Sequence, residues 1–211
     1  MKPRLFSFDI FGTVVDWRQG LEADLARIGR ALGPDDFDRI VDFQGRDEQA
    51  EFRPYREITA RSLVSVLGLG AAEAEHIGRQ LGHWPVFADA PAGLAALLEI
   101  APCVAMTNSD LQHAEGVQQG LGFSLSHWIC AEELGLYKPA PEFWRSVGRR
   151  LQIAPSPAWW HVSAYADYDL DVARALGLTT VFVTRPHRRS GSAHHTVRDL
   201  NELAQLAAQL D

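Results

Sequence analysis

The stretch RLFSFDIFGTVVDWR, residues 4–18, begins with an apolar run and breaks at a glycine turn. Asp9 follows the run directly, and Gly12 and Thr13 stand just beyond it. The run predicts a short buried strand, and a carboxylate at the end of such a strand is costly unless it is paired or functional. We expect backbone N–H groups of the Gly12 turn to hold Asp9, an arrangement that suits a nucleophile or a metal ligand. The simpler alternative is a turn or capping aspartate.

Composition places the chain among ordinary globular proteins. It has 211 residues, 46% apolar and 22% charged, enough for one domain or for a core domain with an insertion. The net charge of −7 argues against a nucleic-acid partner. No apolar run is long enough for a membrane helix and no secretory leader is visible, so the cytoplasm is the expected location. Cys103 and Cys130 lie in apolar runs and are expected to be buried free thiols.

Short apolar runs alternate with amphipathic helical segments over most of the chain. The expected strands are residues 5–8, 103–107, 128–130, 159–163 and 180–184. The expected helices between the later strands are residues 91–99, 110–121, 141–151 and 169–176. This alternation predicts an α/β fold with a doubly wound parallel sheet, a Rossmann-like core, in which ligands bind at the carboxyl ends of the strands.

The segment after the first strand differs from the rest, because it contains no strand candidate. Apolar residues recur at helical spacing over residues 21–32 and 58–67, and residues 71–81 form a third expected helix. We interpret residues 17–87 as a helical cap domain, inserted after the first strand of a core domain made of residues 1–16 and 88–211.

Polar residues follow the second strand. Thr107, Asn108 and Ser109 end it, and Asp110 is expected to begin a helix. These side chains, together with the N-terminus of that helix, can bind an oxyanion or a halide, although a plain N-cap cluster is the alternative.

Further charged residues follow the later strands. Lys138 precedes a proline and can reach a carboxylate at the sheet edge, although most such lysines are surface residues. Asp167, Asp169 and Asp171 follow the fourth strand, where helix capping is the alternative reading.

The order of these signals resembles that of the haloacid dehalogenase superfamily. The resemblance rests on Asp9, on Thr107-Asn108, on Lys138 with its proline, and on the acids that end with Asp169, and it covers nearly the whole chain. Most members are magnesium-dependent phosphatases with a second acid two residues after the nucleophile. Here that position holds Phe11, and a phenyl ring cannot transfer a proton to a leaving group.

The fourth motif also departs from the phosphatase pattern, because Ala164 and Tyr165 stand where its first acid is expected. A magnesium site is therefore poorly supported, and we expect no metal and no cofactor. The stretch FDIFGTVVDWR is similar to the 2-haloacid dehalogenase branch, which needs no metal. That resemblance implies a small anionic organic substrate and, as a family expectation, a homodimer. Asp9 would displace halide from a 2-haloacid, and water would then release a 2-hydroxy acid from the aspartyl ester.

The resemblance also implies residue roles. Thr107 would bind the substrate carboxylate and Asn108 the departing halide. Lys138 would hold Asp9 ionised, since an adjacent cation lowers the pKa of a carboxylate, and Asp169 would pair with Lys138 and help to position or activate water.

The cap is expected to supply an arginine that draws off the halide. Arg46 is the first candidate, with Arg53 and Arg56 as alternatives, while Phe11, Trp17 and Tyr168 would form an apolar wall. The competing hypotheses are a magnesium-dependent phosphatase that uses Asp167 as a metal ligand, and a non-enzymatic binding protein.

Overall fold

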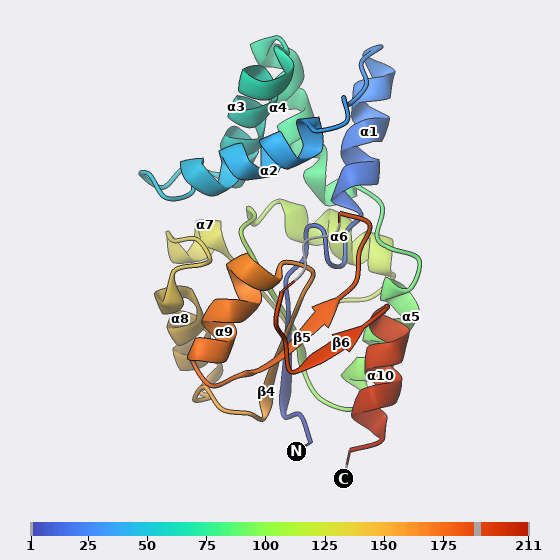
Figure 1. Ribbon diagram of the computed structural model, residues 1–211, viewed down its shortest axis with the longest axis vertical. Helices are drawn as coiled ribbons and strands as arrows, with labels where there is room; N and C mark the ends of the chain where they lie inside the picture. The colour runs from blue at the N-terminus through green and yellow to red at the C-terminus, as the bar shows by residue number, and fades with distance from the viewer. Residues whose placement is uncertain (1, 188–190, 211) are drawn as a thin grey trace.

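The core of the protein is a six-stranded parallel sheet with helices on both faces (Figure 1). The computed structural model describes residues 2–187 and 191–210. The strand order is β3-β2-β1-β4-β5-β6. The strands are β1 (Leu5–Phe8), β2 (Cys103–Thr107), β3 (His127–Cys130), β4 (Trp159–Ser163), β5 (Thr179–Val183) and β6 (His195–Val197). Because β1 lies between β2 and β4, the order reverses there, which places the ligand-binding crevice at the ends of β1 and β4.

Helices of the core cover the two faces of this sheet. In Figure 1, α5 and α10 lie on one side of it and α8 and α9 on the other. The core helices are α5 (Ala90–Leu98), α6 (His113–Leu121), α7 (Ala131–Leu134), α8 (Pro141–Leu151), α9 (Asp171–Ala175) and α10 (Leu200–Ala208). Strands buried on both faces explain why their sequences are continuous apolar runs. None of the helices in the described ranges has the length and apolarity needed to cross a lipid bilayer.

Four helices and one 3₁₀ turn stand over the carboxyl ends of the strands as a cap (Figure 1). They are α1 (Trp17–Arg27), α2 (Asp36–Asp47), α3 (Tyr55–Leu67), α4 (Ala71–Gln80) and η1 (Leu81–His83). Two chain segments join the cap to the core, and they are hydrogen-bonded to each other: the amide of Asp16 donates to Pro85 at 2.7 Å and that of Phe87 to Val14 at 2.9 Å. The connection is therefore a short paired neck.

The strands and helices predicted for the core are present, but β6, α7 and α10 were not predicted and two helices differ in extent. The strand β6 was missed because it has three residues, is half-exposed and pairs only with β5. The helix predicted over residues 110–121 begins at His113, so Asp110 lies before it. The helix predicted over residues 169–176 is a π-helical turn, η2 (Ala166–Leu170), that leads into α9. Both cysteines are buried free thiols, as expected.

The cap predictions were less complete. The helix expected over residues 21–32 ends at Arg27, after which Gly29 adopts a positive φ of 70°. The helix α2 was not predicted at all. Its buried residues Phe37, Ile40 and Gln44 have helical spacing, a pattern that could have revealed it.

Candidate active site

Asp9 lies at the end of β1 and is held by two side chains. The Thr13 hydroxyl donates to its Oδ2 at 2.7 Å, and the Lys138 ammonium donates to its Oδ1 at 3.0 Å. The expected role of the glycine turn is corrected here: the Gly12 amide donates to Val15 within the loop, so a hydroxyl and an ammonium hold the carboxylate. Asp9 keeps 7% of its surface exposed and can be reached from outside.

Lys138 is completely buried and is shared by two carboxylates. Its Nζ lies 3.0 Å from Asp9 Oδ1 and 2.8 Å from Asp169 Oδ2. A buried cation is stable only when it is paired and hydrogen-bonded, and both conditions are met here. Asp9 follows β1, Lys138 follows α7 and Asp169 follows β4, and the three groups form one continuous ion-pair cluster.

A buried hydrogen-bonded chain supports Asp169 from behind. The Trp159 indole donates to Ser7 Oγ at 2.7 Å, and Ser7 Oγ lies 2.7 Å from His161 Nδ1. Since this hydroxyl already accepts from Trp159, it can donate its own proton to Nδ1, which leaves the other ring nitrogen of His161 protonated. That nitrogen, Nε2, lies 3.0 Å from Asp169 Oδ1.

The two carboxylates that share Lys138 have pKa values shifted in opposite directions. Burial alone would raise the pKa of Asp169, but Lys138 and His161 hold it below its ordinary value. Burial raises the pKa of Asp9, and Asp169 adds to this, while Lys138 and Thr13 oppose it. Lys138 thus lowers the pKa of Asp9, as expected, but burial outweighs this effect and the pKa of Asp9 lies above its ordinary value. Burial would lower the pKa of Lys138 itself, but the two carboxylates raise it.

A cavity of about 340 Å³ opens above Asp9, between the core and the cap. It is of the size that takes a small organic molecule. Seven of the nine residues expected at the site, taking Arg46 as the cap arginine, line it: Asp9, Phe11, Trp17, Arg46, Thr107, Asn108 and Tyr168. Lys138 and Asp169 do not line it and reach the cavity only through Asp9. A direct contact of Asp169 with water in the cavity therefore has no support in this geometry.

The comparisons with known proteins agree with this architecture. A sequence model of the haloacid dehalogenase-like hydrolases matches residues 3–160. The chain belongs to the haloacid dehalogenase-like hydrolases. Comparison by sequence with curated proteins gave no match.

Several solved structures share the fold of this haloacid dehalogenase-like hydrolase. The L-2-haloacid dehalogenase PA0810 is 26% identical, with 97% of this chain and 99% of that chain covered and a TM-score of 0.84. The defluorinating L-2-haloacid dehalogenase Rha0230 is 22% identical, with 98% and 95% covered and a TM-score of 0.83. The L-2-haloacid dehalogenase from Xanthobacter autotrophicus is 16% identical, with 99% and 100% covered and a TM-score of 0.85.

The three cap arginines of this hydrolase occupy different places. Arg46, on α2, lines the cavity, whereas Arg53 and Arg56 do not. Arg56 is bound to the core instead, with its guanidinium 3.0 Å from Asp110 and 3.3 Å from Glu132. The geometry thus leaves Arg46 as the candidate that can meet a ligand.

Asp110 connects the core to the cap. Its carboxylate accepts from the backbone amides of Tyr55 and Arg56, at 2.6 and 3.0 Å, in the first turn of α3. A carboxylate at a helix N-terminus satisfies free amides and complements the helix dipole. Asp110 therefore caps a helix of the other domain, not the helix that follows it.

The side chains do not fit the magnesium ion used by most of this superfamily. Both oxygens of Asp169 face nitrogen atoms, the Lys138 ammonium and Nε2 of His161. Asp167 is exposed and does not line the cavity, and Phe11 stands where a second acid would be needed. Within residues 2–187 and 191–210, no group of three or more His, Cys, Asp or Glu side chains is placed to hold a metal. Asp167 thus gives no support to the phosphatase hypothesis.

Sequence reasoning missed several residues that line the cavity. Gln44 lies on α2, Glu48 follows its last residue, and Tyr55 begins α3. The Tyr55 hydroxyl donates to Gln44 at 2.8 Å, and the Tyr55 ring lies 6.4 Å from that of Phe11. The signal for Gln44 was the helical spacing of α2, whereas nothing in the local sequence distinguishes Glu48 from the neighbouring acids.

Proposed function

We propose that this hydrolase displaces halide from small 2-haloalkanoic acids, without a metal, through an ester on Asp9. The observation that carries the proposal is that Asp9, which is buried but still reachable, lines a small cavity together with Phe11. The carboxylate can attack carbon, and the ring provides an apolar wall beside it. A halide such as chloride leaves without a proton, so the missing second acid is no obstacle.

The reaction has two steps. In the first, a carboxylate oxygen of Asp9 forms a bond to C2 of the substrate while the carbon–halogen bond breaks and its electron pair leaves with the halide. In the second, water attacks the carbonyl carbon of the ester, the bond to the C2-bearing oxygen breaks, and that oxygen takes a proton. The products are a 2-hydroxy acid, halide and one proton, and Asp9 is regenerated with an oxygen from water.

The other predicted residues have roles in this proposal that their positions support. Thr107 and Asn108 line the same cavity as Asp9, and Thr107 offers a hydroxyl group to the substrate carboxylate. The Asn108 amide donates to the Lys138 carbonyl and to Tyr168, so it would bind halide by exchanging one of these bonds. Lys138 and Thr13 orient the nucleophile through the hydrogen bonds that they donate to its two oxygens. Arg46 adds a positive charge at the cap side of the cavity, which favours an anionic substrate.

The test is halide release from 2-chloropropionate and chloroacetate with EDTA present. Both enantiomers of 2-chloropropionate should be assayed, the L form first, because the similar structures named above are L-2-haloacid dehalogenases. Asp9→Asn should abolish release. A single turnover in isotopically labelled water should place the label on Asp9 and not in the product.

Other outcomes would overturn the proposal. No halide from any short haloacid would remove the substrate assignment. Turnover of p-nitrophenyl phosphate that depends on magnesium and is lost on chelation would instead favour the phosphatase hypothesis.

A further inference from the structure

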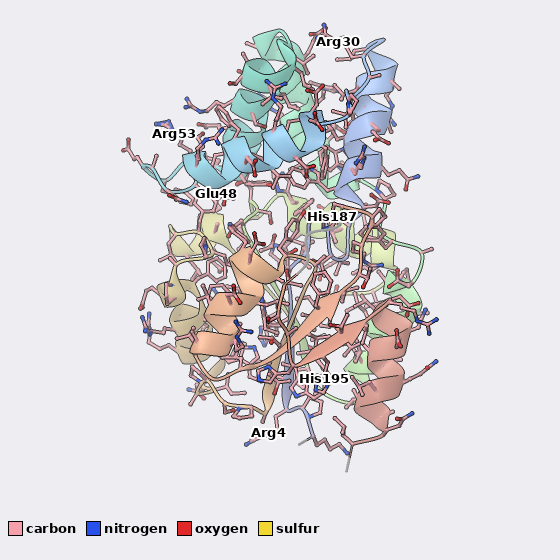
Figure 2. All side chains as sticks on the ribbon, in the orientation of Figure 1. Arg4, Arg30, Glu48, Arg53, His187 and His195 are labelled. Atoms are coloured by element: carbon pink, nitrogen blue, oxygen red, sulfur yellow. The ribbon has the colours of Figure 1, made fainter. Side chains whose placement is uncertain are left out.

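Arg185 is a buried cation outside the cavity, and the reaction described above does not use it. It stands two residues beyond the end of β5 and keeps 7% of its surface exposed. In Figure 2, His187, two residues further along the chain, lies where the core meets the cap. A guanidinium is costly to bury unless its donors are satisfied, so the partners of Arg185 show what it holds in place.

The side chain of Arg185 connects two segments of the chain. Its Nη1 and Nη2 donate to the two oxygens of Asp89 at 2.7 and 3.0 Å, and its Nε donates to the backbone carbonyl of Thr13 at 3.0 Å. The Phe87 ring covers the guanidinium, with its centroid 4.0 Å from Cζ, so a cation–π attraction adds to the packing. Thr13 and Phe87 belong to the two segments that lead into the cap, and Arg185 therefore joins these segments to each other.

Asp89 gives the guanidinium a fixed support. Its Oδ2 also accepts from the Leu200 amide at 2.8 Å, at the start of α10. A two-point pairing between a guanidinium and a carboxylate defines a direction as well as a charge. The orientation of Arg185, and with it the position of Nε beside Thr13, is thus determined by the core.

Thr13 links this support to Asp9. The Thr13 hydroxyl accepts from the Ala164 amide at 2.9 Å and donates to Asp9 Oδ2 at 2.7 Å. A hydroxyl has one proton, and a backbone N–H cannot accept it, so the Thr13 proton is directed at Asp9. Because Arg185 holds the carbonyl of the same residue, Thr13 is fixed through its backbone as well as through its side chain.

We propose that Arg185 is a positioning residue for the nucleophile, because it holds Thr13 where the Thr13 hydroxyl reaches Asp9 Oδ2. Arg185 does not line the cavity, so it acts on Asp9 through Thr13. The inference rests on the proposed role of Asp9 as the nucleophile. It differs from a purely structural ion pair in one respect: disturbing Arg185 should change the properties of Asp9 as well as the stability of the fold.

The pKa of Asp9 reports on the contact with Thr13. The Lys138 ammonium and the Thr13 hydroxyl lower this pKa, while burial and Asp169 raise it. If Thr13 moves away, the carboxylate loses a donor that stabilises its charged form, and its pKa rises further. The charged groups around Asp9 are Lys138 and Asp169 in the core and, lining the cavity from the cap, Asp42, Arg46 and Glu48.

The first experiment follows the titration of Asp9 by NMR, in the full chain labelled with carbon-13 at the aspartate side-chain carboxyl groups. The resonance of Asp9 is identified by its absence from Asp9→Asn. Arg185→Lys keeps the positive charge and can still pair with Asp89, but it has no Nε–H to offer Thr13 as well. We expect the pKa of Asp9 to rise by about one pH unit, the value of one hydrogen bond to a charged group.

Thr13→Val separates positioning from every other effect of Arg185. Removing the hydroxyl should itself raise the pKa of Asp9 by about one pH unit, and Arg185→Lys added to it should then change the pKa no further. Asp89→Asn is a second variant that leaves Arg185 in place but weakens its support. Loss of a negative charge alone would lower the pKa of Asp9, so a rise in this variant reports the displacement of Thr13.

The kinetics of 2-chloropropionate hydrolysis give a second readout. For Arg185→Lys, kcat should fall by about 10- to 100-fold, because a displaced nucleophile reacts slowly. The KM should stay the same, because Arg185 does not line the cavity. The matched control is Arg150→Lys, since Arg150 pairs with Glu133 at 2.6 Å between α8 and α7 and lies outside the cavity. It should change neither the kinetics nor the pKa of Asp9.

The titration needs no substrate, so the inference and the proposed function are tested separately. A pKa of Asp9 that stays the same in Arg185→Lys and in Asp89→Asn, or that rises equally with and without the Thr13 hydroxyl, would overturn the inference. Halide release combined with such a result would leave the proposed function standing. The expected pKa changes without halide release from any haloacid would support the positioning role and remove the substrate assignment.

Discussion

Replacing Lys138 with methionine tests the ion-pair cluster on which the site is built. The change removes a cation that lies 3.0 Å from Asp9 and 2.8 Å from Asp169. With an effective dielectric constant of about 20, each contact is worth roughly 5–6 kcal/mol of Coulomb energy before desolvation is counted. Removing one partner of a buried pair typically costs about 3–5 kcal/mol, because a buried charge is left uncompensated. We expect the free energy of unfolding to fall by about 3–5 kcal/mol near neutral pH.

The pH dependence of this loss follows from the direction of the pKa shifts. In the wild type the pKa of Asp169 lies below its unfolded value of 3.8, so that carboxyl stabilises the fold above this value and the stability is lost as pH falls. Without Lys138, burial should raise the pKa of Asp169 and of Asp9 above the unfolded value. Each carboxyl then costs up to about 1.4 kcal/mol per pH unit as pH rises through the interval between the two values. The difference between variant and wild type should therefore be largest near neutral pH and shrink toward pH 4.

Urea unfolding followed by tryptophan fluorescence at several pH values measures this difference. Arg18→Met is the matched control, since Arg18 forms an exposed pair with Glu22 and should change stability by less than about 1 kcal/mol. Adding Asp169→Asn to Lys138→Met removes one of the stranded charges and should recover part of the loss. A loss below about 1 kcal/mol, or one that does not vary with pH, would refute the reasoning.

Three further changes test other parts of the site. Asp110→Ala removes the carboxylate that caps α3, so it should lower the free energy of unfolding by about 1.5–3 kcal/mol and speed amide hydrogen exchange in the first turn of that helix; unchanged exchange there would contradict its role. Asp169→Asn leaves Lys138 to Asp9 alone, so the acid limb of the pH profile for 2-chloropropionate hydrolysis should move to lower pH, and a move to higher pH would contradict the account of the shared lysine. Gly12→Ala forces a side chain into a backbone with φ of 95° and brings Cβ to 2.3 Å from the Tyr165 hydroxyl, so it should destabilise the fold by at least about 1–2 kcal/mol in thermal unfolding, whereas Gly122→Ala, with a similar φ but open space around it, should cost only the backbone part.

Much of the core could be predicted from sequence because the strands β1 to β5 are separate, mostly apolar runs. Asp9 follows β1, and Thr107 and Asn108 stand at the end of β2. The topology of a parallel sheet is enough to bring these strand ends together. Lys138 was a weaker signal locally, although it is one of only two lysines in the chain. That it serves two carboxylates at once could not be predicted, because the sharing depends on distances in three dimensions.

The cap side of the site was harder to predict for a related reason. The helix α2 was not recognised, and apart from Arg46 the residues of α2 that line the cavity were missed with it. Glu48 accepts a hydrogen bond from the Tyr168 hydroxyl at 2.9 Å, although the two residues are 120 positions apart in the chain. Similarly, Asp110 has the sequence signature of an N-cap, but the helix that it caps belongs to the other domain. Contacts between the cap and the core produce no periodic pattern in the sequence of either segment, so periodicity cannot predict them.

The attachment of α3 to Asp110 has a consequence for how the pocket could be changed. The cap is hydrogen-bonded to the core at several separated places, among them the paired neck at residues 14–16 and 85–87 and the first turn of α3. A cap that is attached on both sides of the cavity cannot rotate away from the core without breaking one of these attachments. The size of the cavity is therefore set when the protein folds. Accepting a bulkier molecule would therefore require shorter side chains on the underside of α2, such as Val41 or Gln49, and weakening the neck would reduce stability without enlarging the chamber.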